Sequence, residues 1–271
     1  MMKIKALLLV ASCLVLVSSA SAKDHGITIN QLVANHLASI GTPVARNAAV
    51  TRFAQGTVRV TDIIAGQVDI GGAAQFISQG DKLKCAFRLG VPQYPGEQFA
   101  FDGKQPEVAI IGPNTRSALG QFLFTQSEIL RNGLLGGSMS TAWPLLNPNS
   151  KQARLKLEGL KKIDGRMLYD VDYTPRNHDA SGDLSIHLYF DPQTFHHVMT
   201  IYRLTLHDAS GQIQKGTDES TQTVEERFDD FRQVDGVTLP AHWTIRYRVE
   251  PGKPSELQWD VHFTGIEQKP L

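Results

Sequence analysis

The stretch TLPAHWTIRYRV, residues 238–249, decides the fold. Within it apolar and polar side chains alternate, so that Trp243 and Tyr247 would share one face of an extended chain. Arg246 and Arg248 would share the opposite face. A period of two residues is that of a β-strand, and a strand with one apolar and one charged face belongs to a sheet that is covered on one side only. We therefore expect an antiparallel strand whose aromatic side faces a core.

The same alternation recurs on both sides of this stretch. Further strand candidates are residues 57–61, 75–78, 83–89, 98–101, 108–111, 154–158, 167–173, 184–190, 198–206, 227–233 and 258–263. Asp-Gly pairs, which are typical of tight hairpin turns, occur at 102–103, 164–165 and 235–236. These features predict a mainly β (α+β) fold, a curled antiparallel half-barrel of roughly ten strands, since sheets of that size tend to curl.

Two amphipathic segments are available to cover the apolar face of this sheet. Residues 27–40 have apolar side chains at helical spacing, and a second short helix is expected over 43–50. Residues 115–132 form one long helical pattern, which a run of glycines ends, and residues 138–150 read as a loop or flap. We expect the N-terminal and mid-chain helices to cover the concave apolar face of a single domain, residues 23–271.

A curled sheet lined with aromatic side chains and covered by helices is a natural apolar pocket. Ordinary core packing is the alternative explanation of the aromatic stripe. In the pocket interpretation the mid-chain helix is a lid and the Gly-rich stretch 133–137 its hinge, because glycine tolerates large backbone changes. The residues expected in the pocket and its lid are Leu119, Phe122, Leu123, Ile129, Phe190, Tyr202, Trp243, Tyr247, Trp259 and Phe263.

The N-terminus has the pattern of a cleaved signal peptide. Two lysines precede an apolar run over residues 6–17, and Ala-Ser-Ala at 20–22 is a cleavage signal. We expect residues 1–22 to be removed and the mature protein to lie in the periplasm. A lipid anchor at Cys13 is the alternative, since the residues before it resemble a lipobox. With cleavage after position 22, Cys85 has no partner in the mature chain, and we expect it to be a small buried hydrophobe.

Composition and motifs argue against a catalytic or nucleic-acid-binding function. The chain has 271 residues, with 27 basic and 27 acidic, whereas nucleic-acid-binding surfaces are basic. It has no Walker loop, dinucleotide fingerprint, HExxH motif or paired cysteines for zinc. Residues 136–140 lack the last glycine of a nucleophile elbow, although a triad built on Ser138 stays open. We expect no enzyme, no cofactor, no metal and no nucleic-acid partner.

Two polar clusters have an ordinary and a functional interpretation. His187, His242 and His262 fall on the wet side of predicted strands, where they could bind a metal on adjacent strands. We favour scattered surface histidines. Residues 225–226 and 229–230 are acidic, and we interpret them as charges that protect a solvated strand edge.

Two hairpins resemble those of a known family. YFDPQTF, residues 189–195, resembles the YFDPxTF hairpin of periplasmic outer-membrane lipoprotein-sorting (LolA-like) proteins. VEERFDDFRQVDGVTLPAHWTIRY, residues 224–247, resembles their DYRxVDGVxLPxxxxI hairpin. The resemblance implies a half-open antiparallel barrel with helices as a lid over an apolar cavity.

The function implied by this resemblance is that of an exported, non-catalytic binding or carrier protein for a hydrophobic ligand. The partner would be a lipid or a lipoprotein acyl chain. The alternative is a cell-envelope regulatory protein that senses lipoproteins or stress through the same fold and binds an envelope protein.

Overall fold

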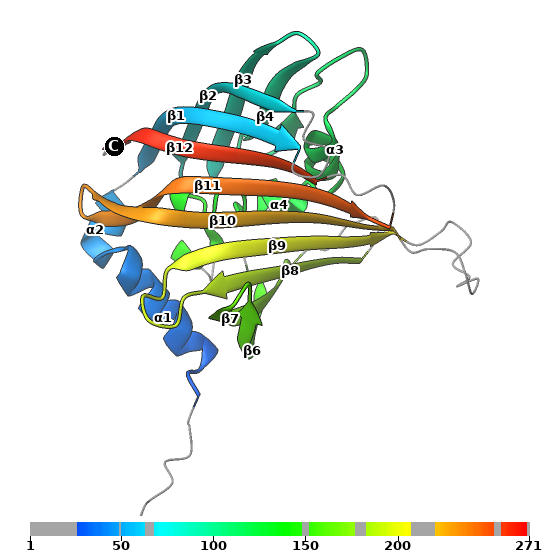
Figure 1. Ribbon diagram of the computed structural model, residues 1–271. Coiled ribbons are helices and arrows are strands. Elements are labelled where there is room, and N and C mark those ends of the chain that lie inside the picture. The colour runs from blue at the N-terminus through cyan, green and yellow to red at the C-terminus, as the bar shows by residue number, and fades with distance from the viewer. Residues whose placement is uncertain are drawn as a thin grey trace, which may run out of the picture.

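One antiparallel sheet organises the protein. The computed structural model describes residues 26–48, 50–62, 68–147, 152–176, 183–206, 220–251 and 256–269. Twelve strands follow one another in the order β5-β4-β3-β2-β1-β12-β11-β10-β9-β8-β7-β6 (Figure 1). The expected mainly β fold with a single curled sheet is confirmed, with twelve strands instead of roughly ten. Their bounds are β1 Thr51–Asp62, β2 Asp69–Gln79, β3 Lys82–Val91, β4 Tyr94–Phe101, β5 Pro106–Val108, β6 Arg154–Ile163, β7 Arg166–Thr174, β8 Asp183–Phe190, β9 His197–Leu206, β10 Ser220–Val234, β11 Val237–Glu250 and β12 Glu256–Lys269.

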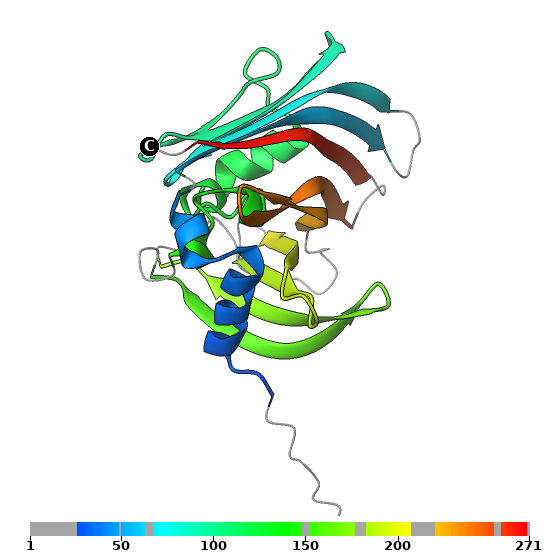
Figure 2. The ribbon, with the colours of Figure 1, turned by 90° about the vertical axis from the view of Figure 1, so that its left-hand side faces the viewer.

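The order of the strands explains how the sheet comes to be covered. The first and last strands, β1 and β12, pair in the middle of the sheet, so the chain first runs outward to the edge at β5. The next strand, β6, lies at the opposite edge. The connection between β5 and β6 therefore has to cross the sheet, and it does so on the concave side, where Figure 2 shows the sheet curving around α3.

The hairpin turns follow the sequence closely. Asp164 and Asp235 have φ of 47° and 49°, and Gly165 and Gly236 each have φ of 82°. Positive φ at both central residues is the geometry that matches the twist of two antiparallel strands, and an Asp-Gly pair adopts it readily. These pairs join β6 to β7 and β10 to β11, as expected.

The N-terminal helices lie where the sequence predicts them. Helix α1, Ile29–Ile40, begins with a capping box between Thr28 and Gln31, and α2, Pro43–Ala48, follows Gly41. Helix α1 lies against β6, β11 and the turn at Pro144–Leu146.

The prediction of one long mid-chain helix over 115–132 is wrong. The structure has two short helices, α3 at Ala118–Thr125 and α4 at Glu128–Arg131. Ser117 caps α3, and Gln126 ends it by leaving helical backbone geometry (φ −104°, ψ 48°). The apolar spacing is preserved across this break, which is why the pattern looked continuous. The strand expected at 108–111 also differs, since β5 ends at Val108.

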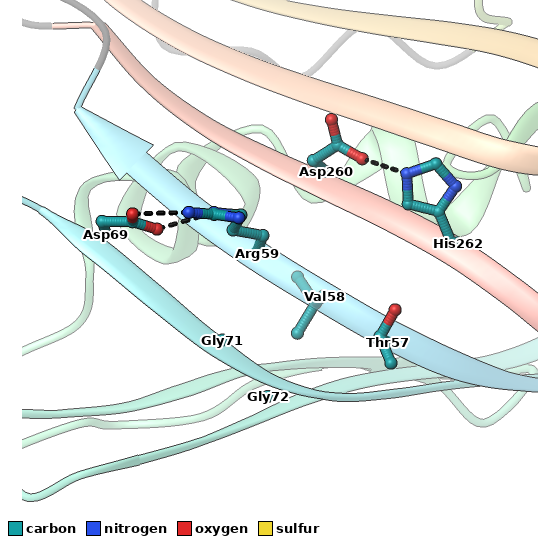
Figure 3. Close-up of a pocket in the computed structure, with 8 residues that line it drawn as sticks. All are labelled: Thr57, Val58, Arg59, Asp69, Gly71, Gly72, Asp260 and His262. Carbon is teal, nitrogen blue, oxygen red and sulfur yellow. Dashed lines mark hydrogen bonds and ion pairs between the residues drawn. The ribbon is translucent and has the colours of Figure 1, made fainter.

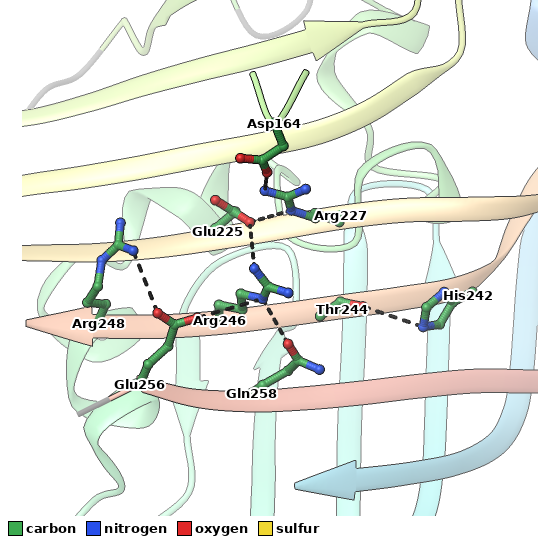
Figure 4. Close-up of polar contacts among 9 residues, drawn as sticks. All are labelled: Asp164, Glu225, Arg227, His242, Thr244, Arg246, Arg248, Glu256 and Gln258. Atoms are coloured by element: carbon green, nitrogen blue, oxygen red, sulfur yellow. Dashed lines mark hydrogen bonds and ion pairs between the residues drawn. The ribbon is translucent and has the colours of Figure 1, made fainter. Parts of the chain in front are cut away.

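On β11 and β12 the two faces of the sheet have opposite chemistry, as the alternation predicts. Ion pairs and hydrogen bonds connect β10, β11 and β12 on the convex face (Figure 4). Arg246 Nε donates to Gln258 Oε1 at 2.8 Å and lies 3.8 Å from Glu256, whose other oxygen is 3.6 Å from Arg248. Exposed pairs of this kind contribute little stability, so the fold depends on its apolar concave face.

The remaining expectations concern the termini and the cysteines. The predicted signal peptide, residues 1–22, and Cys13 lie outside the described residues. Cys85 is fully buried in β3 and has a free thiol, as expected. Within the described ranges, none of the helices has the length and apolar character that a membrane span requires.

Candidate functional site

The ten residues predicted for the pocket and its lid do come together. Every one of them is buried, the most exposed being Tyr247 at 9%, and all belong to a single apolar cluster. Rings from the lid and the sheet meet edge to face, as in Phe122 against Tyr247 with centroids 6.3 Å apart. Trp243 lies in the same way against Phe76 and Phe87. The predicted site is therefore packed with the protein's own side chains in this structure.

The segment that fills the concave face, residues 118–147, is here called the cover. It consists of α3, α4 and two 3₁₀ turns, Gly137–Met139 and Pro144–Leu146. The second part was expected to be a loop or flap, but between Gly133 and Leu145 only Thr141 is not buried. This segment is part of the core because apolar side chains such as Leu134, Leu135 and Trp143 are buried there. The hydrophobic content of the stretch is the sequence signal that would have predicted its burial.

Glycine is required where the cover passes closest to the sheet. Gly137 has φ of 52°, and a Cβ atom on it would lie 2.7 Å from His197 Nδ1. A larger residue would be strained by its backbone and would also clash with the imidazole ring of β9. The Gly-rich stretch thus allows close contact, and its role as a hinge stays a prediction.

Two charged side chains fasten the cover to the sheet. Glu226 of β10 accepts a hydrogen bond from the backbone N–H of Gly136 at 2.8 Å. Arg52 of β1 donates to the carbonyl oxygens of Ser138 and Met139 at 2.8 and 2.7 Å. Both side chains are buried, Glu226 at 0% exposure and Arg52 at 2%. They hold the backbone of one short turn from two sides.

The environment of these groups changes their acid–base behaviour. Burial raises the pKa of Glu226 to about 7, although Tyr202 donates to its second oxygen at 2.7 Å. Burial lowers the pKa of Arg52 to about 10, which leaves the guanidinium charged at neutral pH. The interpretation of Glu226 as part of a solvated edge is therefore wrong, because β10 is an interior strand and this side chain lies on its concave face.

A third contact fastens the end of the cover to α1. Trp143 Nε1 donates to His36 Nε2 at 3.0 Å, so the proton of the neutral imidazole is on Nδ1, which contacts the carbonyl oxygen of Phe195 at 3.0 Å. Burial lowers the pKa of His36 to about 4, and the ring is neutral at physiological pH. A further hydrogen bond runs from the N–H of Thr141 to Ser78 Oγ at 3.0 Å.

The other end of the cover has its own buried polar chain. Ser117, the N-cap of α3, donates to Glu97 Oε2 at 2.7 Å, and Glu97 accepts a hydrogen bond from Tyr94. Trp259 Nε1 donates to the Tyr94 hydroxyl at 2.8 Å. Burial raises the pKa of Glu97 to about 7. The first helix of the cover is thus positioned by β4 and β12.

A pocket opens at the side of the cover. Its volume is about 320 Å³, and it lies between α2 and the second 3₁₀ turn. Arg52 is one of its lining residues, and Arg46, which donates to the carbonyl oxygens of Leu37 and Gly41, is another. The lining residues are Ile40, Pro43, Arg46, Asn47, Arg52, Thr141, Leu146 and Asn147.

Other candidates from the sequence lie in different places. Ser138 is buried at 3% exposure, and its carbonyl oxygen accepts from Arg52. Of the three histidines, His242 and His262 are direct partners across β11 and β12, beside a second pocket that Figure 3 shows on the convex face. His187 is on β8, where it pairs with Asp170 at 2.7 Å.

Three solved structures are similar to this chain over most of its length. A LolA superfamily protein from Nitrosomonas europaea matches 91% of this chain and 96% of its own, at 12% identity and a TM-score of 0.46. An outer membrane lipoprotein-sorting protein domain from Vibrio parahaemolyticus matches 87% and 91%, at 9% identity and a TM-score of 0.43. A DUF1329 family protein from Desulfovibrio piger matches 89% and 92%, at 8% identity and a TM-score of 0.40.

The solved structures that match thus include LolA-like proteins, the family that the two hairpins resemble. No family model matches the chain, and no curated protein matches it.

The polar contacts that hold the cover were not predicted, although the sequence of β1 contains a signal for one of them. Arg52 shares its face of β1 with Ala54, Val58 and Val60, all of which are buried. A charged residue in register with an apolar stripe is the pattern that marks a buried polar contact.

Proposed function

We propose that this protein is an exported, non-catalytic binding protein that carries a hydrophobic ligand, a lipid or an acyl chain, on the concave face of its sheet. One observation carries the proposal: a largely apolar face is covered by a single chain segment whose turn is fastened by two buried ionisable side chains, Arg52 and Glu226. Burying ionisable groups costs free energy, so they are not needed in a core that serves stability alone. Such groups are useful where a contact has to be made and released.

The energies involved are suited to an exchange between cover and ligand. A hydrogen bond to a charged group is worth about 1.5–3 kcal/mol, and burying one large apolar side chain about 1.5–3 kcal/mol. An acyl chain gains about 0.8 kcal/mol for each methylene it buries. About ten to fifteen methylenes therefore gain about 8–12 kcal/mol, which is comparable to the burial of the four side chains Leu119, Phe122, Leu123 and Ile129.

The pocket beside Arg52 gives this exchange a starting point. It lies beside the cover, and Arg52, whose guanidinium holds Ser138 and Met139, is one of the residues that line it. A polar head group that entered this pocket would compete with those two carbonyl oxygens for the same donors. The turn would then lose its tether at the place where an acyl chain could follow.

The N-terminal sequence supports the location. We propose that residues 1–22 direct export to the periplasm and are removed after Ala22, and that the protein is not anchored at Cys13. The intact mass of the exported protein tests this directly. A chain that begins at an acylated Cys13 would contradict it.

Native mass spectrometry of protein purified from the periplasm without detergent tests the binding function. The proposal expects a population with the added mass of a lipid, which disappears when the protein is unfolded and refolded in lipid-free buffer. Recovery of the protein without lipid, in a complex with an envelope protein, would contradict the carrier function and support the regulatory alternative.

A further inference from the structure

The convex face of the sheet brings two histidines and an aspartate to one point. His242 of β11 and His262 of β12 are directly opposed, with parallel rings whose centroids are 4.2 Å apart. Both present Nε2 to the same oxygen, Oδ1 of Asp260, at 3.0 and 2.8 Å. Asp260 lies two residues from His262 on the same strand, so its side chain points to the same face. Figure 3 shows Asp260 and His262 side by side.

A second carboxylate orients one of the two rings. Asp229 of β10 is the cross-strand partner of His242, and its Oδ1 lies 2.7 Å from His242 Nδ1. The ring is therefore held by Nδ1 and directs Nε2 toward Asp260. A carboxylate on the far nitrogen of an imidazole is the arrangement that orients histidine ligands in metal sites.

We propose that His242, Asp260 and His262 form a binding site for a divalent transition-metal ion of the zinc class. Two imidazole nitrogens and one carboxylate oxygen are a ligand set that zinc accepts, whereas calcium and magnesium require oxygen ligands. One ligand atom from each residue lies within 4.8 Å of the others. A tetrahedral zinc ion needs these atoms about 3.3 Å apart, so a modest side-chain movement closes the site. The side chain of His262 is 58% exposed and has the room to make it.

The basic side chain opposite the site is paired with a carboxylate. Arg59 lies on the neighbouring strand β1, opposite Asp260, and its Nε and Nη2 donate to the two carboxylate oxygens of Asp69 at 2.7 and 2.6 Å, which offsets its charge. Beside it the pocket on the convex face, about 740 Å³ in volume, is lined by Thr57 and Gly71 as well as by Asp260 and His262. A fourth ligand, water or an anion, would approach the ion from this pocket.

The site is independent of the proposed carrier function, because it lies on the opposite face of the sheet from the cover. If no metal ion binds to the convex face, the proposed carrier function is unaffected. If no lipid binds to the concave face, the proposed metal site is likewise unaffected. The sequence pattern groups His187 with the other two histidines, whereas the structure separates it from them. His187 therefore serves as a matched control, a histidine on the same sheet with one carboxylate partner, Asp170, at 2.7 Å.

Isothermal titration of the tag-free, chelator-treated protein with Zn²⁺ tests the proposal, with the absorption spectrum of the Co²⁺ form as a report on geometry. We expect one ion per chain, intense tetrahedral Co²⁺ bands and no competition from Mg²⁺. Asp229→Asn should weaken Zn²⁺ binding by about 10–100-fold, and His262→Ala by at least as much. His187→Ala should leave it unchanged. Circular dichroism confirms that each variant is folded.

Two results would overturn the proposal. One is the absence of Zn²⁺ binding to the wild-type protein in the micromolar range. The other is a His262→Ala variant that is folded and binds Zn²⁺ as tightly as the wild type, since the ion would then have other ligands.

Discussion

Replacing Glu226 by glutamine should make the protein more stable at alkaline pH. Glu226 is fully buried, and burial raises its pKa from 4.5 to about 7. Glutamine has the shape of the protonated acid. Its carbonyl oxygen can accept from the N–H of Gly136, and its amide can donate to the hydroxyl of Tyr202, so both present contacts have a counterpart.

The pKa values fix the direction and size of the effect. Between pH 4.5 and about 7 the folded wild type keeps a proton on Glu226 that the unfolded chain has released. The free energy of unfolding therefore falls as the pH rises through this range. The free energy of unfolding changes by about 1.36 kcal/mol for each pH unit between the two pKa values. Glu226 alone therefore lowers the free energy of unfolding by about 2–3 kcal/mol between pH 5 and pH 8. Glutamine does not titrate and removes that loss.

Denaturant unfolding at pH 5 and pH 8 measures the effect. We expect Glu226→Gln to be close to the wild type at pH 5 and more stable by about 2–3 kcal/mol at pH 8. Glu225→Gln is the matched control, since its carboxylate lies on the outer face beside Arg227 and Arg246. If Glu226→Gln retained the full pH dependence of the wild type, or if Glu225→Gln gained as much, a buried ionisable tether at Gly136 would be refuted.

Three further substitutions test the cover and the core beneath it. Trp243→Ala should lower the free energy of unfolding by about 3–5 kcal/mol in denaturant titrations, and a loss below about 1 kcal/mol would show that the ring is not closely packed. Phe122→Asp should increase the fluorescence of an apolar dye, whereas Phe124→Asp, at a position 48% exposed on the same helix, should not. Arg52→Met removes the donors to the turn while it keeps apolar bulk, so dye binding should rise more than in the exposed control Arg88→Met. Equal dye binding in either pair of variants would contradict the role given to the cover.

Sequence patterns predicted the fold because the sheet repeats simple local rules. Alternation located β10, β11 and β12, and the Asp-Gly pairs located the turn between β10 and β11 and the turn between β6 and β7. A local pattern is sufficient to locate a strand, because each strand of this sheet buries one face and the burial appears as alternation in the sequence. The same patterns do not contain the strand order, in which β1 joins β12 and forces the chain across the concave face.

The candidate site could be predicted only in its apolar part. The ten predicted residues share one cluster because the apolar face of a strand or helix is buried in the hydrophobic core. Glu226 was misread since it adjoins Glu225 and stands close to Asp229 and Asp230 in the chain. Its neighbours on the strand face, Val224 and Phe228, are buried. The pairing of His242 with His262 depended on the register of β11 against β12, which no local pattern gives.

Hydrogen exchange across the cover, with and without palmitate, tests the carrier account most directly. The N–H groups of Gly136 and Thr141 are suitable reporters, because they donate to Glu226 and Ser78 and lose those partners when the cover leaves the sheet. The account predicts that residues 118–147 exchange faster than β10 and β11 in the free protein, and that palmitate changes their exchange while the two strands stay the same. Exchange in the cover as slow as in β10, and unaffected by palmitate, would show a fixed part of the core and contradict the account.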